Sequence, residues 1–210
     1  MKKIKNNVID LFCGCGGISE GFKLAGFNII AGIDLNEDAL KTFAYNFTNT
    51  RAICEDLLNF DDKRIRKEFG KDNIDVIVGG PPCQGFSVAG KMDPRDPRSQ
   101  HVWKFLELVS TLKPKAFVME NVKNLAVNYR WSEMKNALID GAEMLGYSTK
   151  IFLLNASDYE VPQNRERMFL VGIRGGTPLN PIPVTALNRP TVRDALKALP
   201  KFGNPGNYGF

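Results

Sequence analysis

The chain has 210 residues, of which 43% are hydrophobic and 24% are charged. This composition predicts a soluble protein with one substantial core, and it excludes a chain that is disordered overall. The formal net charge of +5 is compatible with a polyanionic partner without requiring one, and no apolar run approaches the ~18 residues that a membrane span needs.

Strand and helix patterns alternate along the first 120 residues. The patterns predict strands at 8–12, 27–34, 51–54, 74–78 and 116–119, and helices at 19–26, 38–47 and 102–112. Residues 61–67 carry so many charges that we expect only a solvated helix face there. Alternation of this kind predicts a parallel sheet with right-handed crossovers.

The remainder of the chain has a different pattern. A helix is predicted at about 131–145, followed by a pair of closing strands at 147–154 and 167–173. From residue 178 onward, frequent prolines exclude regular structure except for a short helix at 191–199. We therefore expect a catalytic domain at 1–177 and a Pro/Gly-rich tail at 178–210 without a core of its own.

Cysteine and histidine usage bears on metals and on compartment. The four cysteines and the single histidine, His101, show no paired spacing typical of a zinc site. Residues 1–7 are basic but lack the apolar run and cleavage site of a signal peptide. We expect reduced thiols, no bound metal, no membrane association and a cytoplasmic location.

One cysteine stands at a special place in the predicted sheet. The strand at 74–78 is followed by two glycines and two prolines, which end it and present Cys83 at its carboxyl edge on a stiff turn. Ligands of open α/β sheets bind at that edge. Cys83 is therefore a candidate nucleophile, although a cysteine taken alone is more often an inert small hydrophobe.

The turn after the first strand indicates a nucleotide-like cofactor. Asp34 ends the second strand 20 residues after Gly14, a layout in which the acid accepts hydrogen bonds from ribose hydroxyls. A dinucleotide fingerprint starting at Gly14 would need glycine where the chain has Ser19, which favours S-adenosylmethionine over a pyrophosphate cofactor. Asp56, which follows the third strand, is a candidate acceptor for an adenine amino group. The alternative is that the glycines only form a tight turn.

Four motifs in this order carry a family resemblance: residues 10–17 (DLFCGCGG), 80–87 (GPPCQGFS), 120–122 (ENV) and 163–167 (QNRER). With them the chain resembles the cytosine-C5 DNA methyltransferases over residues 6–175. The resemblance implies an S-adenosylmethionine-dependent, Rossmann-like, mainly parallel α/β sheet with helices on both faces and an antiparallel closing strand. It also implies cofactor contacts from Phe12, Gly14, Gly16, Gly17, Asp34, Leu35, Asp56, Leu57 and Pro82.

The implied chemistry suits these residue types. Carbon 5 of cytosine is a weak nucleophile, and addition of the Cys83 thiolate at C6 would convert the ring into an enamine that accepts a methyl group. Glu120 would hold the ring at N3 and share a proton there. Arg165 and Arg167 would hydrogen-bond O2 of the base.

The target base would have to leave the duplex to reach such a pocket. The loop after Cys83 carries the candidate nucleic-acid contacts Gln84, Ser87, Lys91 and Arg98. The alternative for this Gly/Pro-rich loop is that it is simply mobile.

The chain departs from the family pattern in two ways. His101 stands where the family usually has an apolar residue that lines the adenine pocket. More importantly, the target-recognition region and the final helix that completes the cofactor site do not follow the tail. Either the chain is truncated or it is one subunit of a split enzyme, and both explanations predict an exposed apolar surface where the helix would pack. The isolated chain should then methylate poorly.

Three functions remain for comparison. The leading one is the catalytic portion of a DNA cytosine-C5 methyltransferase of a restriction-modification system, with double-stranded DNA and a second polypeptide as partners. The alternatives are a tRNA cytosine-C5 methyltransferase and a non-catalytic subunit of a methyltransferase complex. A nicotinamide-dependent oxidoreductase is disfavoured by Ser19 and by the motif around Cys83.

Overall fold

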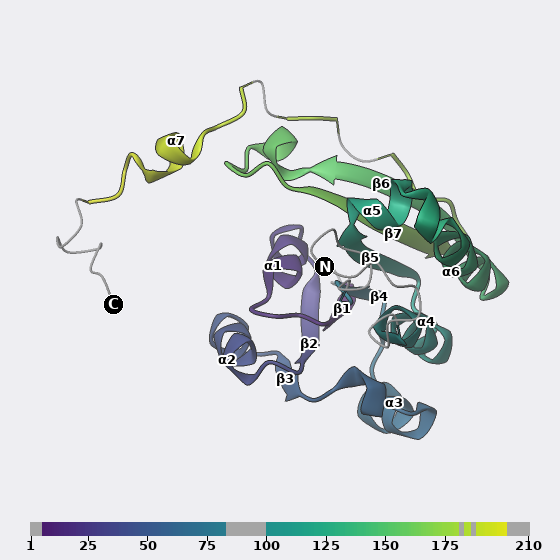
Figure 1. Ribbon diagram of the computed structural model, residues 1–210. Helices are drawn as coiled ribbons and strands as arrows, with labels where there is room; N and C mark the ends of the chain where they lie inside the picture. Colours follow the sequence, from purple (N-terminus) through teal and green to yellow (C-terminus); the bar gives the residue numbers. More distant parts are fainter. Residues whose placement is uncertain (1–5, 83–99, 181–182, 186–187, 201–210) are drawn as a thin grey trace, which may run out of the picture.

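A seven-stranded sheet with helices on both faces forms the body of the protein in the computed structural model, which describes residues 6–82, 100–180, 183–185 and 188–200. The strand order is β3-β2-β1-β4-β5-β7-β6 (Figure 1). The strands are β1 (Asn7–Leu11), β2 (Asn28–Asp34), β3 (Arg51–Cys54), β4 (Val76–Gly79), β5 (Ala116–Val122), β6 (Tyr147–Asn155) and β7 (Glu166–Arg174). The α-helices are α1 (Gly17–Leu24), α2 (Glu37–Asn46), α3 (Asp62–Phe69), α4 (Gln100–Leu112), α5 (Lys123–Val127), α6 (Ser132–Met144) and α7 (Val192–Leu196).

The predicted fold class is confirmed by the strand pairing. Strands β1 to β5 are all parallel, β7 runs antiparallel to β5, and β6 runs antiparallel to β7. All five parallel strands therefore end at one edge of the sheet, which is where β7 begins. The first turn, the Pro81–Pro82 segment and the end of β5 meet at this edge.

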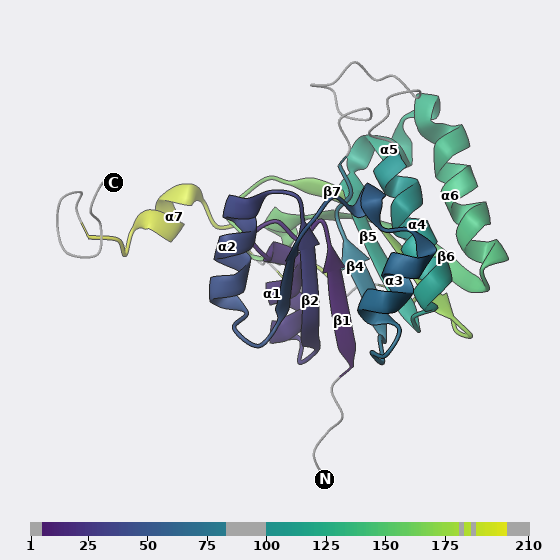
Figure 2. The same cartoon turned by 90° about the horizontal axis from the view of Figure 1, so that it is seen from below.

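Alternation along the central strands divides the core into two layers. Ile9 and Leu11 of β1 lie in a cluster with side chains of α3, α4 and α6, whereas Val8 packs with α2 side chains such as Phe43 on the other face. Successive side chains of a strand point to opposite faces, so a strand buried on both faces is apolar at most positions. Figure 2 shows the two groups of helices on either side of the sheet.

Two predicted segments differ from the structure. Strand β5 continues to Val122 instead of ending at residue 119, because its antiparallel partner β7 extends the ladder to the pair Val122–Arg167. The charged segment at 61–67 has a buried side as well as a solvated one, since Ile65 and Phe69 of α3 are 0% and 1% exposed. The prediction of only a solvated face was therefore incomplete, because the number of charges does not reveal these two core residues.

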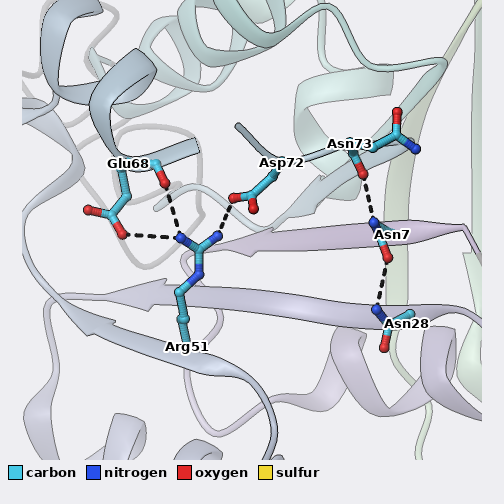
Figure 3. A network of polar contacts seen from close by, with 6 residues as sticks. All are labelled: Asn7, Asn28, Arg51, Glu68, Asp72 and Asn73. Carbon is cyan, nitrogen blue, oxygen red and sulfur yellow. Dashed lines mark hydrogen bonds and ion pairs between the residues drawn. The ribbon is translucent and has the colours of Figure 1, made fainter. Parts of the chain in front are cut away.

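The edge of the sheet opposite the site is held by a polar network (Figure 3). Arg51, at the start of β3, contacts the carbonyl oxygen of Glu68 at 3.0 Å and the carboxylates of Glu68 and Asp72. Asn7 Nδ2 donates to the carbonyl of Asn73 at 2.8 Å, and Asn28 Nδ2 donates to Asn7 Oδ1 at 2.8 Å. These contacts attach β3, β2 and β1 to α3 and the turn that follows it.

The predicted tail helix is present but shorter than expected. Helix α7 spans Val192–Leu196 and begins with a capping box between Thr191 and Asp194. None of its residues is buried, and Figure 1 shows α7 standing apart from the sheet. Closer to the body, Thr185 N donates to the carbonyl of Asp158 at 3.1 Å. In the described part of the chain, no helix is long and apolar enough to cross a membrane.

Candidate active site

The turn after β1 has an unusual backbone. Phe12, Gly14 and Gly16 all have positive φ, at 59°, 53° and 98°, and the turn is closed by a 2.9 Å hydrogen bond from Gly16 N to the carbonyl of Cys13. A Cβ atom on Gly16 would lie 2.4 Å from the Phe47 ring. Gly16 is therefore required both by its conformation and by the lack of space beside it.

Asp34 shapes this turn from the end of β2. Its Oδ2 accepts from Gly14 N at 2.7 Å and its Oδ1 accepts from Asn36 N at 2.8 Å. Each carboxylate oxygen has two lone pairs, so the group that fixes the turn can also accept from a ribose hydroxyl. The next residue, Leu35, is 67% exposed at the same edge. An acid and an exposed apolar side chain therefore lie at the edge where the sequence predicts a nucleoside-like cofactor.

Two predicted cofactor residues, Asp56 and Leu57, follow the third strand. Asp56 Oδ1 accepts from Leu58 N at 2.9 Å, which caps the 3-10 helix Leu57–Asn59. Leu57 itself is 2% exposed and belongs to the core.

On the other side of the turn, the ring of His101 meets the ring of Phe12 edge-on at 5.4 Å. His101 Nδ1 is buried and, within the described residues, has no hydrogen-bond partner.

A buried acid beneath the turn was missed by the sequence analysis. Asp10 and Ser19 are both fully buried, and Ser19 Oγ donates to Asp10 Oδ2 at 2.6 Å. Burial raises the pKa of Asp10 to about 7, against hydrogen bonds from Ser19 that lower it. Burial, followed by the nearby charge of Asp10, also raises the pKa of the Cys13 thiol, which argues against Cys13 as a nucleophile. The signal in the sequence is Asp10 itself, a charged residue within an otherwise apolar strand segment.

Three predicted catalytic side chains are brought together where β5 and β7 pair. Glu120 Oε1 lies 3.0 Å from Arg167 Nε and 3.4 Å from Arg165 Nη2. The Glu120 side chain is only 20% exposed, whereas that of Arg165 is 46% exposed. Both ion pairs use Oε1, while Oε2 faces Gly80, where an added Cβ would lie 3.2 Å away. A side chain at position 80 would therefore be in tight contact with the acid.

Asn121 links this cluster to the segment that leads to Cys83. Its side chain is 1% exposed, and its Nδ2 donates to the carbonyl of Pro81 at 3.3 Å. This contact fixes the Pro81–Pro82 segment against the end of β5. Asn121 belongs to the motif at 120–122, but the motif alone does not predict this contact. The predicted residues Cys83, Gln84, Ser87, Lys91 and Arg98 lie outside the described residues.

A cavity of about 590 Å³ opens beside the cluster. Its first wall is the outer side of α1, with Gly17, Ile18, Gly21 and Phe22. The facing wall includes Leu154, Tyr159 and Phe169, and the cluster of Glu120, Arg165 and Arg167 also lines the cavity. The cavity is therefore largely apolar, and it extends from Gly17, at the end of the turn after β1 (the cofactor turn), to the candidate catalytic groups. Among the described residues, no group of three or more His, Cys, Asp or Glu could hold a metal ion.

Comparison with known proteins defines the family. The model of the C-5 cytosine-specific DNA methylase family matches residues 6–203. The chain is 40% identical over 176 residues to the type II methyltransferase M.DdeI of Desulfomicrobium norvegicum, covering 83% of this chain and 42% of that protein. It is 37% identical over 220 residues to M.XorII of Xanthomonas oryzae pv. oryzae, covering 95% and 51%. The chain belongs to the C-5 cytosine-specific DNA methylase family.

A solved structure agrees with this assignment. A protein encoded within an Escherichia coli prophage, assigned as a DNA modification methyltransferase, superposes with a TM-score of 0.80 at 34% identity. The match covers 94% of this chain and 56% of that one. The predicted family is therefore confirmed. The chain spans about half the length of the curated relatives named above.

Proposed function

We propose that this chain is the catalytic portion of a DNA cytosine-C5 methyltransferase, acting through a covalent bond between Cys83 and C6 of an extruded cytosine. The family and the relatives support the reaction class. The observation that carries the proposal is the cluster of Glu120, Arg165 and Arg167, which lies beside the Pro81–Pro82 segment through the Asn121 contact.

The cofactor turn fits S-adenosylmethionine. Asp34 would accept from the ribose hydroxyls, and the backbone conformation at Gly14 and Gly16 would let the ligand approach the turn closely. The residues proposed to hold the cofactor are Phe12, Gly14, Gly16, Gly17, Asp34, Leu35, Asp56, Leu57 and Pro82. When bound, S-adenosylmethionine supplies a sulfonium methyl group to carbon 5.

The chain's own residues would then act in sequence. The Cys83 thiolate adds to C6, and the ring electrons move toward N3, where Glu120 holds a proton in a hydrogen bond so that charge does not accumulate. Arg165 and Arg167 donate to O2 and keep Glu120 oriented. After carbon 5 has accepted the methyl group it loses its proton to solvent water, the C5–C6 double bond re-forms, N3 returns its proton to Glu120 and Cys83 leaves as a thiolate.

A second part of the enzyme is proposed to fill the cavity of about 590 Å³. Its walls on α1 and β7 are mostly apolar, and the chain corresponds to only about half of its relatives. The occupant would be an apolar segment from the rest of the enzyme, either in a continuation of the chain or on a second polypeptide. That part would also supply the reading of the DNA sequence.

Transfer of labelled methyl groups tests the proposed function. The 210-residue chain is incubated with S-adenosylmethionine and either duplex DNA or tRNA, alone and together with the corresponding recognition half of a relative. We expect label at C5 of cytosine in DNA, weak with the chain alone and strong with the added half. Label found only in tRNA would show that tRNA, and not DNA, is the substrate. No transfer to either nucleic acid would favour a non-catalytic subunit.

A further inference from the structure

A second and smaller cavity lies next to the catalytic cluster. This polar crevice has a volume of about 380 Å³ and is lined by Lys123, Asn124, the loop residues Gln163 and Asn164, and Arg165 to Arg167. Arg165 and Arg167 also line the larger cavity that Glu120 faces. Anything bound in the polar crevice would therefore touch the same two arginines that hold Glu120.

The lining of the polar crevice suits an anion. Lys123, Arg165 and Arg167 contribute three cationic groups, against the single carboxylate of Glu166. The side-chain amides of Asn124, Gln163 and Asn164 add neutral hydrogen-bond donors. A phosphodiester, which is anionic and offers several acceptor oxygens, matches this set of donors better than an uncharged ligand does.

The wall of the polar crevice is braced from β6. Asn155 Oδ1 accepts from Arg165 N at 3.0 Å, and Asn155 Nδ2 donates to Asn164 Oδ1 at 2.6 Å. The first bond holds the backbone at Arg165 and the second holds the Asn164 side chain before any ligand arrives. The crevice is thus a built feature of the β6–β7 connection, and its donors need little rearrangement to bind.

One ion pair occupies the polar crevice in the free protein. Lys123 Nζ lies 2.8 Å and 2.9 Å from the two carboxylate oxygens of Glu166, and the two side chains are 43% and 50% exposed. Exposed pairs of this kind contribute only about 0–1 kcal/mol to stability. The Lys123 ammonium can therefore exchange its partner for a better anion at little cost.

We propose that the polar crevice binds a backbone phosphate of the nucleic-acid strand beside the extruded cytosine, and that Lys123 leaves Glu166 to bind it. This inference rests on the proposed function, because a base held between Glu120 and the arginines carries its flanking phosphates into this region. The Glu166 carboxylate then competes with the phosphate for Lys123. While no nucleic acid is bound, Glu166 keeps Lys123 in place.

Binding of DNA to the full chain tests this exchange. The probe is a fluorescent duplex with one mispaired cytosine, which lowers the cost of extruding the base, and the dissociation constant is measured against salt concentration. Lys123→Gln should weaken binding roughly tenfold in ~50 mM salt and reduce the slope of log K against log salt by about 1. Glu166→Gln should strengthen binding, because the competing carboxylate is gone.

Matched controls come from an exposed ion pair on α2. Lys41 lies 3.1 Å from Glu37, and neither residue is near the polar crevice. Lys41→Gln and Glu37→Gln change the net charge equally and should change binding only slightly, with all four variants melting like the wild type. If the Lys123 and Glu166 variants behave like these controls while wild-type protein binds the duplex, the exchange is wrong and the proposed function stands. Failure of wild-type protein to bind DNA at low salt, even with the recognition half of a relative added, would overturn both.

Discussion

Single residues in this site have roles set by their surroundings. Glu120 shares one oxygen between two guanidinium groups and remains partly open to the cavity, as a group that touches substrate must. Asp10, the other carboxyl discussed above, is fully buried and accepts a hydrogen bond from Ser19. We therefore propose a chemical role for the first carboxyl and a structural role beneath the turn for the second.

Glu120→Gln should remove most of the methylation while leaving the fold intact. The amide preserves the shape but cannot transfer a proton at N3, so the transfer rate should fall by ~10²–10⁴-fold. Because both arginines keep contact with solvent and the amide oxygen can still accept their hydrogen bonds, the free energy of unfolding should change by about 1 kcal/mol or less. Single-turnover methylation and urea unfolding measure the two effects. A variant as active as the wild type would remove Glu120 from the mechanism.

Asp10→Asn should flatten part of the pH dependence of stability. The folded pKa of about 7 lies above the unfolded value of 3.8, so the folded state binds the proton more tightly and loses stability as pH rises between these values. The asparagine variant has no such loss. Its free energy of unfolding relative to wild type should rise by on the order of a few kcal/mol from pH 4 to pH 7, then level off. A difference that does not vary with pH would contradict this.

At the scale of elements, the sequence predicts more of the strands than of the connections. Buried strands such as β4 are continuous apolar runs, and the turns after them carry glycine or proline. The extension of β5 to Val122 depends on pairing with β7, some 45 residues further along, which no local pattern reveals. For the same reason the motifs predicted Glu120 and Arg167 as site residues, but not the ion pair between them or the bond from Asn121 to Pro81.

Two glycines on either side of the start of α1 provide a test of the turn. Gly16→Ala forces a side chain into positive φ and against the Phe47 ring, so it should destabilise the protein by about 1–3 kcal/mol and weaken cofactor binding. The control is Gly21→Ala, within α1, where an added Cβ meets nothing within 4 Å. That change should be neutral or stabilise by about 0.5–1 kcal/mol. Equal destabilisation by both, measured by urea unfolding, would refute the role given to Gly16.

At the scale of the whole molecule, the structure has an intact sheet edge and an incompletely covered side. The candidate catalytic groups and the cofactor turn meet at one edge, yet the cavity between α1 and β7 is lined by side chains such as Ile18 and Phe169. The family resemblance predicts that an exposed apolar surface exists, but it does not predict that this surface lies between α1 and β7. What covers it could not be predicted, because about half of each relative lies outside the matched length.

Filling the cavity from within should block the second part of the enzyme. Gly21→Phe places a ring in the cavity without a clash near its Cβ, whereas Gly21→Ala leaves the space open. We expect the phenylalanine variant to lose stimulation by an added recognition half, while the alanine variant keeps it. Melting temperatures confirm that both are folded. Equal stimulation of the two variants would show that the occupant packs elsewhere.

Covalent trapping is the most direct test of the central claim. A duplex with 5-fluorocytosine at the target position cannot release the enzyme after methyl transfer, since the fluorine at C5 does not leave as a proton does. With S-adenosylmethionine and the recognition half present, we expect a stable protein–DNA adduct whose peptide map assigns the bond to Cys83 and which is lost in Cys83→Ser. The absence of an adduct, or one formed at the exposed Cys15 or Cys54, would contradict the account.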